Sequence, residues 1–110
     1  MRVIQVIARM NIGGTARYLS LLSNSLNERG IESKIATGYV QGSESEDPSV
    51  KDVDLVRIPS MGRSINPFAD YRAMGQLQKI ISDFKPDIIH THTFKAGFIG
   101  RYPKRRAKLV

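Results

Sequence analysis

Cysteine is absent from the 110 residues of the chain. Disulfide bonds and thiolate metal sites are therefore excluded, and the absence suits the reducing environment of the cytoplasm. Long apolar runs are also absent, because no stretch approaches the roughly 18 residues that a membrane-spanning helix needs. The apolar segment Val3–Ala8 is shorter than the hydrophobic region of a signal peptide and is followed at once by Arg9. We therefore expect a protein of the cytoplasm.

Positive charge is in excess, with 17 lysine and arginine residues against 10 aspartate and glutamate residues and a net charge of +7. Such an excess favours an anionic partner: nucleic acid, an acidic membrane surface or a phosphorylated small molecule. Basic residues crowd positions 101–108, whereas positions 44–54 are acidic. A basic run is more often a solvated face than a binding surface, so charge alone does not select among these partners.

The length fits one domain, and we treat residues 1–110 as a single unit. Runs of apolar, often β-branched residues predict five strands, at 1–8, 31–39, 54–58, 87–91 and 107–110. Apolar residues at helical spacing predict three helices between them, at 15–29, 67–85 and 95–102. The polar segment 41–48 is expected to be an exposed loop.

Residues at the helix ends support these bounds. Gly30 suits the left-handed conformation just past the end of a helix. Asn66 can cap a helix that Pro67 begins without losing a hydrogen bond, and Pro86 ends that helix by Lys85. The inner face of the first helix is expected to carry Tyr18, Leu19, Leu22 and Leu26, and that of the second Ala73, Met74, Leu77, Ile80, Ile81 and Phe84.

The alternation of strands and helices predicts an α/β fold: a Rossmann-like, mostly parallel sheet with helices on both faces and the first strand at its centre. In such sheets ligands bind beyond the carboxyl ends of the strands, near the position where the strand order reverses. The segments expected at that position are 9–15, after the first strand, and 92–95, after the fourth.

Two adjacent glycines, Gly13 and Gly14, join the first strand to the first helix. Backbone N–H groups there and the positive helix end suit a phosphate or a sugar hydroxyl, although a tight turn alone is an equal explanation. The segment is not the G-x-G-x-x-G fingerprint, and the second strand ends at Thr37-Gly38 without the acidic residue that would hold a ribose. It is not a P-loop either. A nicotinamide enzyme is therefore disfavoured.

His90 and His92 are the two histidines of the chain and stand at the carboxyl end of the fourth strand. In an extended backbone they share one face, roughly 6.5 Å apart. A metal site would need a third ligand, and none follows at a recognisable spacing, so no metal is expected. Two interpretations remain: a solvated or hydrogen-bonded pair at the sheet end, or contact with substrate and proton transfer.

Segments 9–17 (RMNIGGTAR) and 85–101 (KPDIIHTHTFKAGFIGR) resemble the amino-terminal domain of family-four glycosyltransferases. The resemblance extends over the whole chain in the order and spacing of its elements, and the second segment is the more specific. It implies the GT-B fold, in which two Rossmann-like domains face a cleft. It also implies transfer of a sugar from a nucleotide-sugar donor to a glycan or lipid-linked acceptor, with retention of configuration and without a metal or cofactor.

By the same resemblance, the chain is the acceptor-side half, and it lacks the carboxyl-terminal donor-binding domain. Gly13, Gly14 and Thr15 would then approach the donor when the cleft closes, and the acceptor side would be lined by His92, Thr93 and Lys95. The catalytic residues stay unassigned, because the family's histidine after the fifth strand and its two glutamates fall beyond Val110. We expect the chain alone to be inactive, since transfer needs donor and acceptor held together.

The expected role is in polysaccharide or glycoconjugate biosynthesis, in the cytoplasm and in peripheral contact with the anionic inner face of the membrane. No specific nucleic-acid partner is expected. The alternative is a stand-alone binding module for an anionic polymer, which the net charge motivates but no motif supports.

Overall fold

The computed structural model describes residues 1–10, 14–40, 45–61, 67–92 and 108–109. All five predicted strands and the first two predicted helices are present, and the predicted helix over 95–102 lies outside the described residues. A short 3₁₀-helix, η1, forms where the sequence predicts no helix. In chain order the elements are β1 (Arg2–Ile7), α1 (Gly14–Glu28), β2 (Glu32–Thr37), η1 (Pro48–Asp52), β3 (Leu55–Arg57), α2 (Pro67–Phe84), β4 (Ile88–His92) and β5 (Lys108–Leu109).

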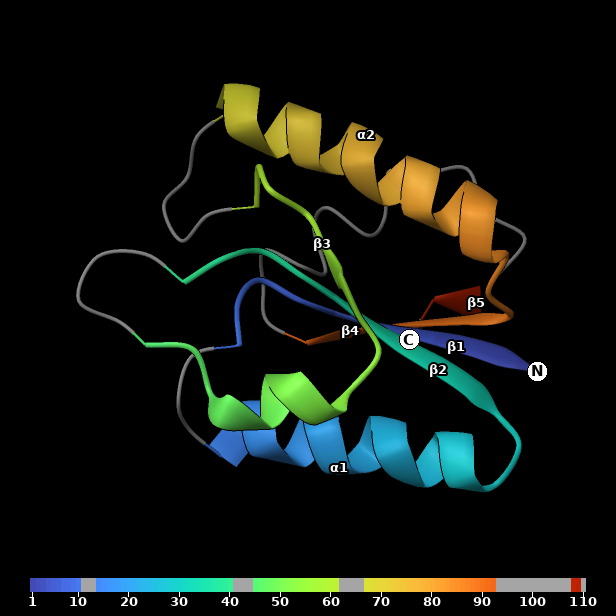
Figure 1. Ribbon diagram of the computed structural model, residues 1–110. Coiled ribbons are helices and arrows are strands. Elements are labelled where there is room, and N and C mark those ends of the chain that lie inside the picture. Colours follow the sequence, from blue (N-terminus) through green and yellow to red (C-terminus); the bar gives the residue numbers. More distant parts are fainter. Residues whose placement is uncertain (11–13, 41–44, 62–66, 93–107, 110) are drawn as a thin grey trace.

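The five strands form one parallel sheet in the order β3-β2-β1-β4-β5, so β1 is central as the sequence predicts. α2 lies on one face of the sheet, and α1 with η1 lies on the other (Figure 1). The chain moves outward from β1 to β2 and back from β3 to β4. Because both crossovers are right-handed, their helices fall on opposite faces. The predicted Rossmann-like α/β fold is confirmed.

The face of the sheet under α2 carries the larger hydrophobic core. Alternation along β1 turns Ile4 and Val6 toward this face, where they join the α2 side chains and Ile89 of β4. Each fully buried aliphatic side chain contributes roughly 1.5–3 kcal/mol relative to an exposed one. The stripe predicted for α2 is confirmed: Ala73, Leu77, Ile81 and Phe84 are buried, and Met74 and Ile80 pack at its border.

The face of α1 that meets the sheet differs from the prediction. Tyr18 is 58% exposed, and the buried positions of the helix include Ser20 and Ser23. Ser20 Oγ lies 2.9 Å from Ser49 Oγ in η1, and Ser23 Oγ lies 3.0 Å from Ser33 Oγ in β2. Hydroxyls with partners are buried at little cost, and small side chains let the helix approach the strand. Leu19 is buried as predicted, but hydrophobicity alone wrongly included Tyr18 and missed the two serines.

The end of β3 is tied to the end of β2 by Arg57. Its guanidinium donates two hydrogen bonds to the Glu46 carboxylate, at 2.6 and 2.5 Å, and one to the Gly38 carbonyl oxygen at 2.9 Å. It also lies over the Tyr39 ring, 4.6 Å from the centroid. The hydrogen bond with Glu46 raises the pKa of Arg57 above its ordinary value, although burial opposes the shift. This cluster fixes the carboxyl ends of both strands.

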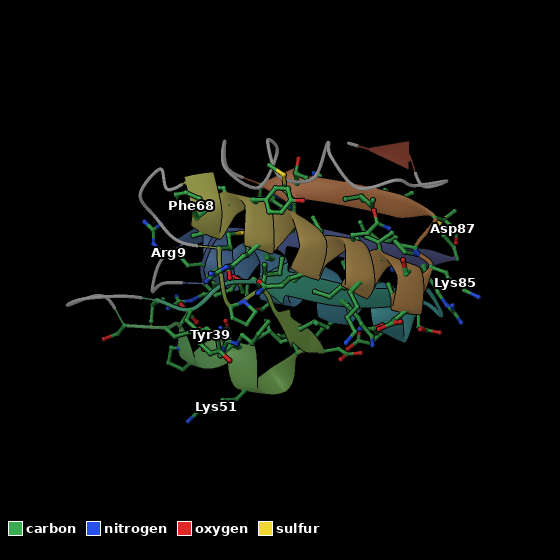
Figure 2. The ribbon with its side chains drawn as sticks, turned by 90° about the horizontal axis from the view of Figure 1, so that it is seen from above. Arg9, Tyr39, Lys51, Phe68, Lys85 and Asp87 are labelled. Carbon is green, nitrogen blue, oxygen red and sulfur yellow. The ribbon has the colours of Figure 1, made fainter. Side chains whose placement is uncertain are left out.

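The two ends of the sheet carry different residues. Arg9, which follows β1, lies toward the same end as Tyr39 and Phe68, whereas Lys85 and Asp87 lie toward the other end (Figure 2). Arg9 and Tyr39 follow the carboxyl ends of β1 and β2, and Phe68 lies in the first turn of α2. Lys85 and Asp87 precede β4. Because α2 runs back between β3 and β4, its first turn stands at the end where a parallel sheet binds ligands.

Candidate functional site

Parallel pairing brings the carboxyl ends of β1 and β4 together. Ile7, the last residue of β1, stands opposite His92, the last residue of β4, and α1 begins at Gly14 after the loop that leaves β1. Gly14 and His92 therefore lie at the same edge of the sheet, as expected if these two strands are neighbours. Thr15 is exposed in the first turn of α1. The other predicted site residues, Gly13, Thr93 and Lys95, lie outside the described residues.

The packing of the described residues does not require a glycine at position 14. A Cβ built on Gly14 would meet no heavy atom of the described chain within 4 Å. Among the glycines that the structure describes, the one with a positive φ is Gly30, at 82°. The turn that precedes Gly14 lies outside the described residues, so the structure does not decide between a tight turn and a ligand site. Among the described residues, the space above the Gly14 backbone is open at the positive end of a 15-residue helix, where an anionic or hydroxyl-bearing ligand is favoured.

Both histidines stand on the face of the sheet that α1 covers, because His92 is in register with Ile7, a member of that core. Their ring centroids are 4.0 Å apart and tilted by 51°, which confirms that they share a face. His92 Nε2 lies 2.8 Å from Oε1 of Gln5, whose side chain is buried in β1. Sequence reasoning missed Gln5, because nothing local in the sequence signals a partner on another strand.

His92 is neutral near pH 7. Burial of the ring and, to a smaller extent, repulsion from His90 lower the pKa of His92 from 6.5 to about 4. A neutral imidazole with one nitrogen bonded to Gln5 keeps its second nitrogen for another hydrogen bond. Within the part of the chain that the structure describes, no three His, Cys, Asp or Glu side chains gather closely enough to hold a metal ion. The arrangement suits hydrogen bonding or proton transfer.

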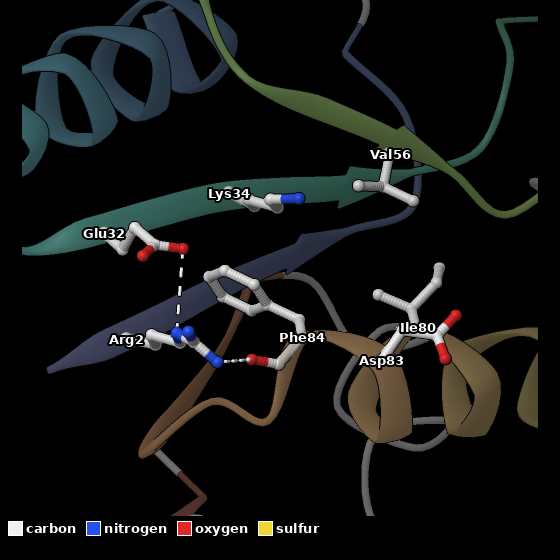
Figure 3. A pocket seen from close by; sticks show the side chains of 7 residues that line it. All are labelled: Arg2, Glu32, Lys34, Val56, Ile80, Asp83 and Phe84. Atoms are coloured by element: carbon white, nitrogen blue, oxygen red, sulfur yellow. Dashed lines mark hydrogen bonds and ion pairs between the residues drawn. The ribbon is translucent and has the colours of Figure 1, made fainter.

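A pocket of about 380 Å³ opens at the other end of the sheet, between the starts of β1 and β2 and the last turns of α2 (Figure 3). Arg2 Nε lies 3.6 Å from Glu32 Oε2, and Arg2 and Lys34 lie over the Phe84 ring, 5.8 and 5.0 Å from its centroid. The positive groups thus already face a carboxylate and a ring. The lining residues are Arg2, Glu32, Lys34, Val56, Ile80, Asp83 and Phe84.

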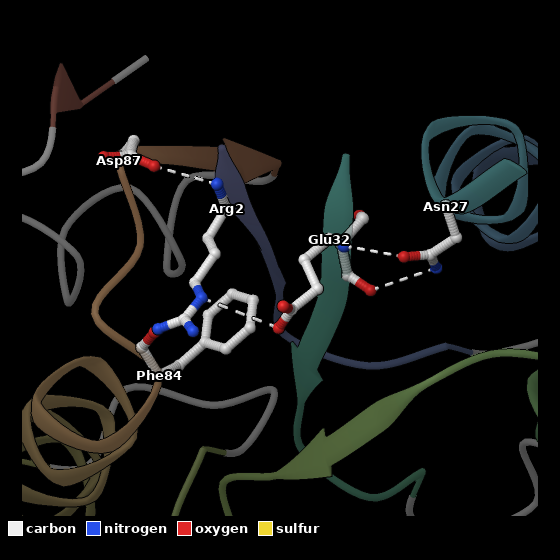
Figure 4. Close-up of polar contacts among 6 residues, drawn as sticks. Arg2, Asn27, Glu32, Phe84 and Asp87 are labelled. Atoms are coloured by element: carbon white, nitrogen blue, oxygen red, sulfur yellow. Dashed lines mark hydrogen bonds and ion pairs between the residues drawn. The ribbon is translucent and has the colours of Figure 1, made fainter. Parts of the chain in front are cut away.

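Hydrogen bonds around this pocket hold elements together (Figure 4). Arg2 donates from its backbone N to Asp87 Oδ2 at 2.8 Å and from Nη1 to the Phe84 carbonyl oxygen at 2.9 Å. The Asn27 amide accepts from Ser33 N at 2.9 Å and donates to Ser33 O at 3.3 Å. These contacts join β1 to the end of α2 and α1 to β2. The amino-end pocket is therefore part of the scaffold, and the candidate site is the carboxyl edge.

Comparisons with known proteins agree with this fold. Residues 13–110 match the family model of the glycosyl transferase 4-like domain. Over 50 residues the chain is 36% identical to the Escherichia coli UDP-Gal:alpha-D-GlcNAc-diphosphoundecaprenol alpha-1,3-galactosyltransferase. The matched segment covers 46% of this chain and 13% of that relative. The apo form of the lipopolysaccharide outer core galactosyltransferase WaaB has a TM-score of 0.78 at 10% identity, over 99% of this chain and 32% of WaaB. The Neisseria meningitidis UDP-GlcNAc 2-epimerase bound to UDP-GlcNAc has a TM-score of 0.66 at 20% identity, over 93% of this chain and 30% of the epimerase.

The fold is the Rossmann-like amino-terminal half of the GT-B architecture. Because the family model covers most of its length, the chain belongs to the glycosyl transferase 4-like domain family. The resemblance drawn from segments 9–17 and 85–101 is confirmed. The chain spans about a third of the solved structures that it matches, and likenesses at this level of identity show the fold alone. In the described part of the chain, no helix is both long and apolar enough to cross a membrane.

Proposed function

We propose that the chain is the acceptor-side domain of a retaining glycosyltransferase that moves a sugar from a nucleotide-sugar donor to a glycan or lipid-linked acceptor in polysaccharide or glycoconjugate biosynthesis. The observation that carries the proposal is the family match over residues 13–110. It is supported by the relative from Escherichia coli, whose name gives UDP-Gal as donor and a diphosphoundecaprenol-linked sugar as acceptor. The polymer-binding alternative gains no support, because residues 101–107 of its basic segment lie outside the described residues.

In this proposal the donor approaches Gly13, Gly14 and Thr15, and the acceptor contacts His92, Thr93 and Lys95. The open space over Gly14 and the neutral His92 at the same sheet edge support the assignment. The proposal assigns donor binding and the catalytic groups to a second domain of a longer protein, outside these 110 residues, and requires no metal or cofactor. The 110-residue chain alone is then inactive, because a cleft formed by two domains is needed to hold both substrates in reacting geometry.

Replacing Gly14 with valine is expected to lower sugar transfer by the longer protein about 10-fold or more, since a branched side chain would fill the space that the donor enters. Thermal unfolding should stay almost unchanged, because a Cβ at this position meets no described atom within 4 Å. Steady-state transfer from nucleotide sugars and the melting temperature are measured together. Gly75→Val is the matched control, as a Cβ on Gly75 also meets nothing within 4 Å but the residue lies in the interior of α2 rather than at a helix start. Full activity of Gly14→Val would contradict the donor assignment.

We also propose a cytoplasmic location with peripheral contact at the anionic inner face of the membrane. The supporting observation is a pair of exposed aromatic side chains, Phe68 at 82% and Tyr71 at 77%, in the first turns of α2. Arg72 beside them is exposed and positive. Aromatic and basic side chains together favour the interface of an acidic bilayer. This end of α2 is also the end of the candidate site, so a lipid-linked acceptor would arrive next to it.

The double variant Phe68→Ser, Tyr71→Ser is expected to bind vesicles containing phosphatidylglycerol about 10-fold less than the unchanged chain, since two apolar anchors are lost. Leu21→Ser is the control, because Leu21 is 65% exposed but belongs to α1 on the opposite face of the sheet. Sedimentation with vesicles gives the bound fraction. Equal loss in both variants, or equal binding to neutral phosphatidylcholine vesicles, would refute a specific contact through α2.

A further inference from the structure

Gln5 is a polar exception in the central strand. Its neighbours in β1 are Val3, Ile4, Val6 and Ile7, and its side chain is only 1% exposed. Burying an amide without a partner costs on the order of 1–3 kcal/mol, whereas an apolar side chain of similar size would be stabilising there. A buried amide at position 5 therefore costs free energy of folding unless a hydrogen-bond partner offsets that cost.

The partner of Gln5 lies at the functional end of a neighbouring strand. Gln5 is in register with His90, yet its Oε1 contacts Nε2 of His92, two residues further along β4, at 2.8 Å. The His92 ring thus leans back along the strand, beside the His90 ring at 4.0 Å between centroids. Because an amide oxygen cannot donate, the hydrogen of this bond belongs to Nε2. In the neutral ring, Nδ1 then holds a lone pair and accepts hydrogen bonds.

We infer that Gln5 is a positioning residue: it fixes His92 as the Nε2–H tautomer, so that Nδ1 accepts a hydrogen bond from a hydroxyl group of the bound substrate. A phosphate oxygen would need a donor at this nitrogen, and the fixed tautomer offers none. His92 therefore selects a sugar or lipid-alcohol hydroxyl rather than a phosphate at this edge. The inference rests on the proposed function for the identity of the ligand, but the tautomer itself does not depend on it.

The tautomer is tested by NMR of the 110-residue chain with ¹⁵N-labelled histidine. The unchanged chain is expected to show a protected Nε2–H proton on His92 near pH 7, and Gln5→Leu is expected to lose that protection. Gln5→Glu, which keeps an acceptor oxygen and adds a negative charge, should raise the pKa of His92 above 6.5. His90, whose ring lies beside that of His92, is followed in the same spectra. A protected Nδ1–H in the unchanged chain would overturn the inference.

The role of Nδ1 is tested by sugar transfer in the longer protein at a pH where NMR shows His92 to be an imidazolium in Gln5→Glu. Because an imidazolium has no lone pair, we expect kcat/KM to fall about 10-fold or more, with recovery as the pH rises through the new pKa. Unchanged activity in that charged state would overturn the hydroxyl assignment while the tautomer result stands. If the unchanged protein transfers no sugar at all, the proposed function fails instead. Inorganic phosphate is then titrated into the 110-residue chain: a change in the His92 ¹⁵N shifts would overturn the inference, and unchanged shifts would support it.

Discussion

Replacing Gly38 with alanine is expected to destabilise the fold by about 3 kcal/mol, at the upper end of the usual cost of overpacking. A Cβ at this position would clash with the backbone carbonyl oxygen of Met61 and would lie 2.7 Å from that of Ala8. Both obstacles are main-chain atoms, which cannot swing aside like the end of a flexible side chain. Gly38 N also donates to Ala8 O at 2.9 Å, so the clash would disturb a hydrogen bond between two strand ends.

The measurement is equilibrium unfolding in urea, followed by circular dichroism. Gly75→Ala is the matched control, because a Cβ there meets nothing within 4 Å and alanine favours the interior of a helix by roughly 0.5–1 kcal/mol. The two glycine-to-alanine changes should therefore have opposite signs. A Gly38→Ala protein as stable as the unchanged chain would show that the ends of β1 and β2 do not approach the segment at Met61 as described.

Truncating Leu77 to alanine is expected to cost about 3–4 kcal/mol, within the range measured for buried leucines. Leu77 is fully buried where α2 packs on the sheet, in the same core as Ile4 and Ile89. Removal of its isobutyl group takes away apolar burial and leaves a cavity beneath a helix that is held on one side. For a domain of this size the loss is a large share of the total stability.

Leu21→Ala is the control for Leu77→Ala, since it makes the same chemical change at a side chain that is 65% exposed on α1. Its free energy of unfolding should change by less than about 0.5 kcal/mol. Thermal and urea unfolding of both variants give the comparison. A loss of similar size in the two proteins would contradict the packing of Leu77 between α2 and the sheet.

The sequence was sufficient for the fold because each local signal agreed with the next. The β-branched start placed β1 at the centre, and Pro86 and Gly30 marked helix ends that the structure confirms. The inner face of α1 was predicted only in part: Leu19 is buried, but Ser20 and Ser23 are also buried, through hydroxyl partners on η1 and β2. Such partners come from other elements, and a hydropathy pattern along one helix does not contain them.

The candidate site was likewise predicted only in part. The placement of Gly14 and His92 at the same edge of the sheet followed from strand order, since the carboxyl ends of neighbouring parallel strands share an edge. The bond between Gln5 and His92 joins residues 87 positions apart, so no motif or spacing announces it. The sequence also does not show why each glycine is needed. A Cβ on Gly38 would meet backbone atoms, whereas a Cβ on Gly14 would meet no described atom within 4 Å. The pairs of residues that meet only in space are the ones that sequence reasoning missed.

The central place of β1 has a consequence for the chain as it leaves the ribosome. β1 is made well before its neighbour β4, since the bond from Arg2 to Asp87 beside the β1–β4 pairing spans 85 residues. At a synthesis rate of roughly 5–20 residues per second, one edge of β1 stays unpaired for about 4–17 s before β4 is made. Until then its N–H and C=O groups are open to any other strand. Slow synthesis between residues 10 and 88 would therefore favour aggregation of the nascent chain, and a chaperone that covers β1 would have its greatest effect in this interval.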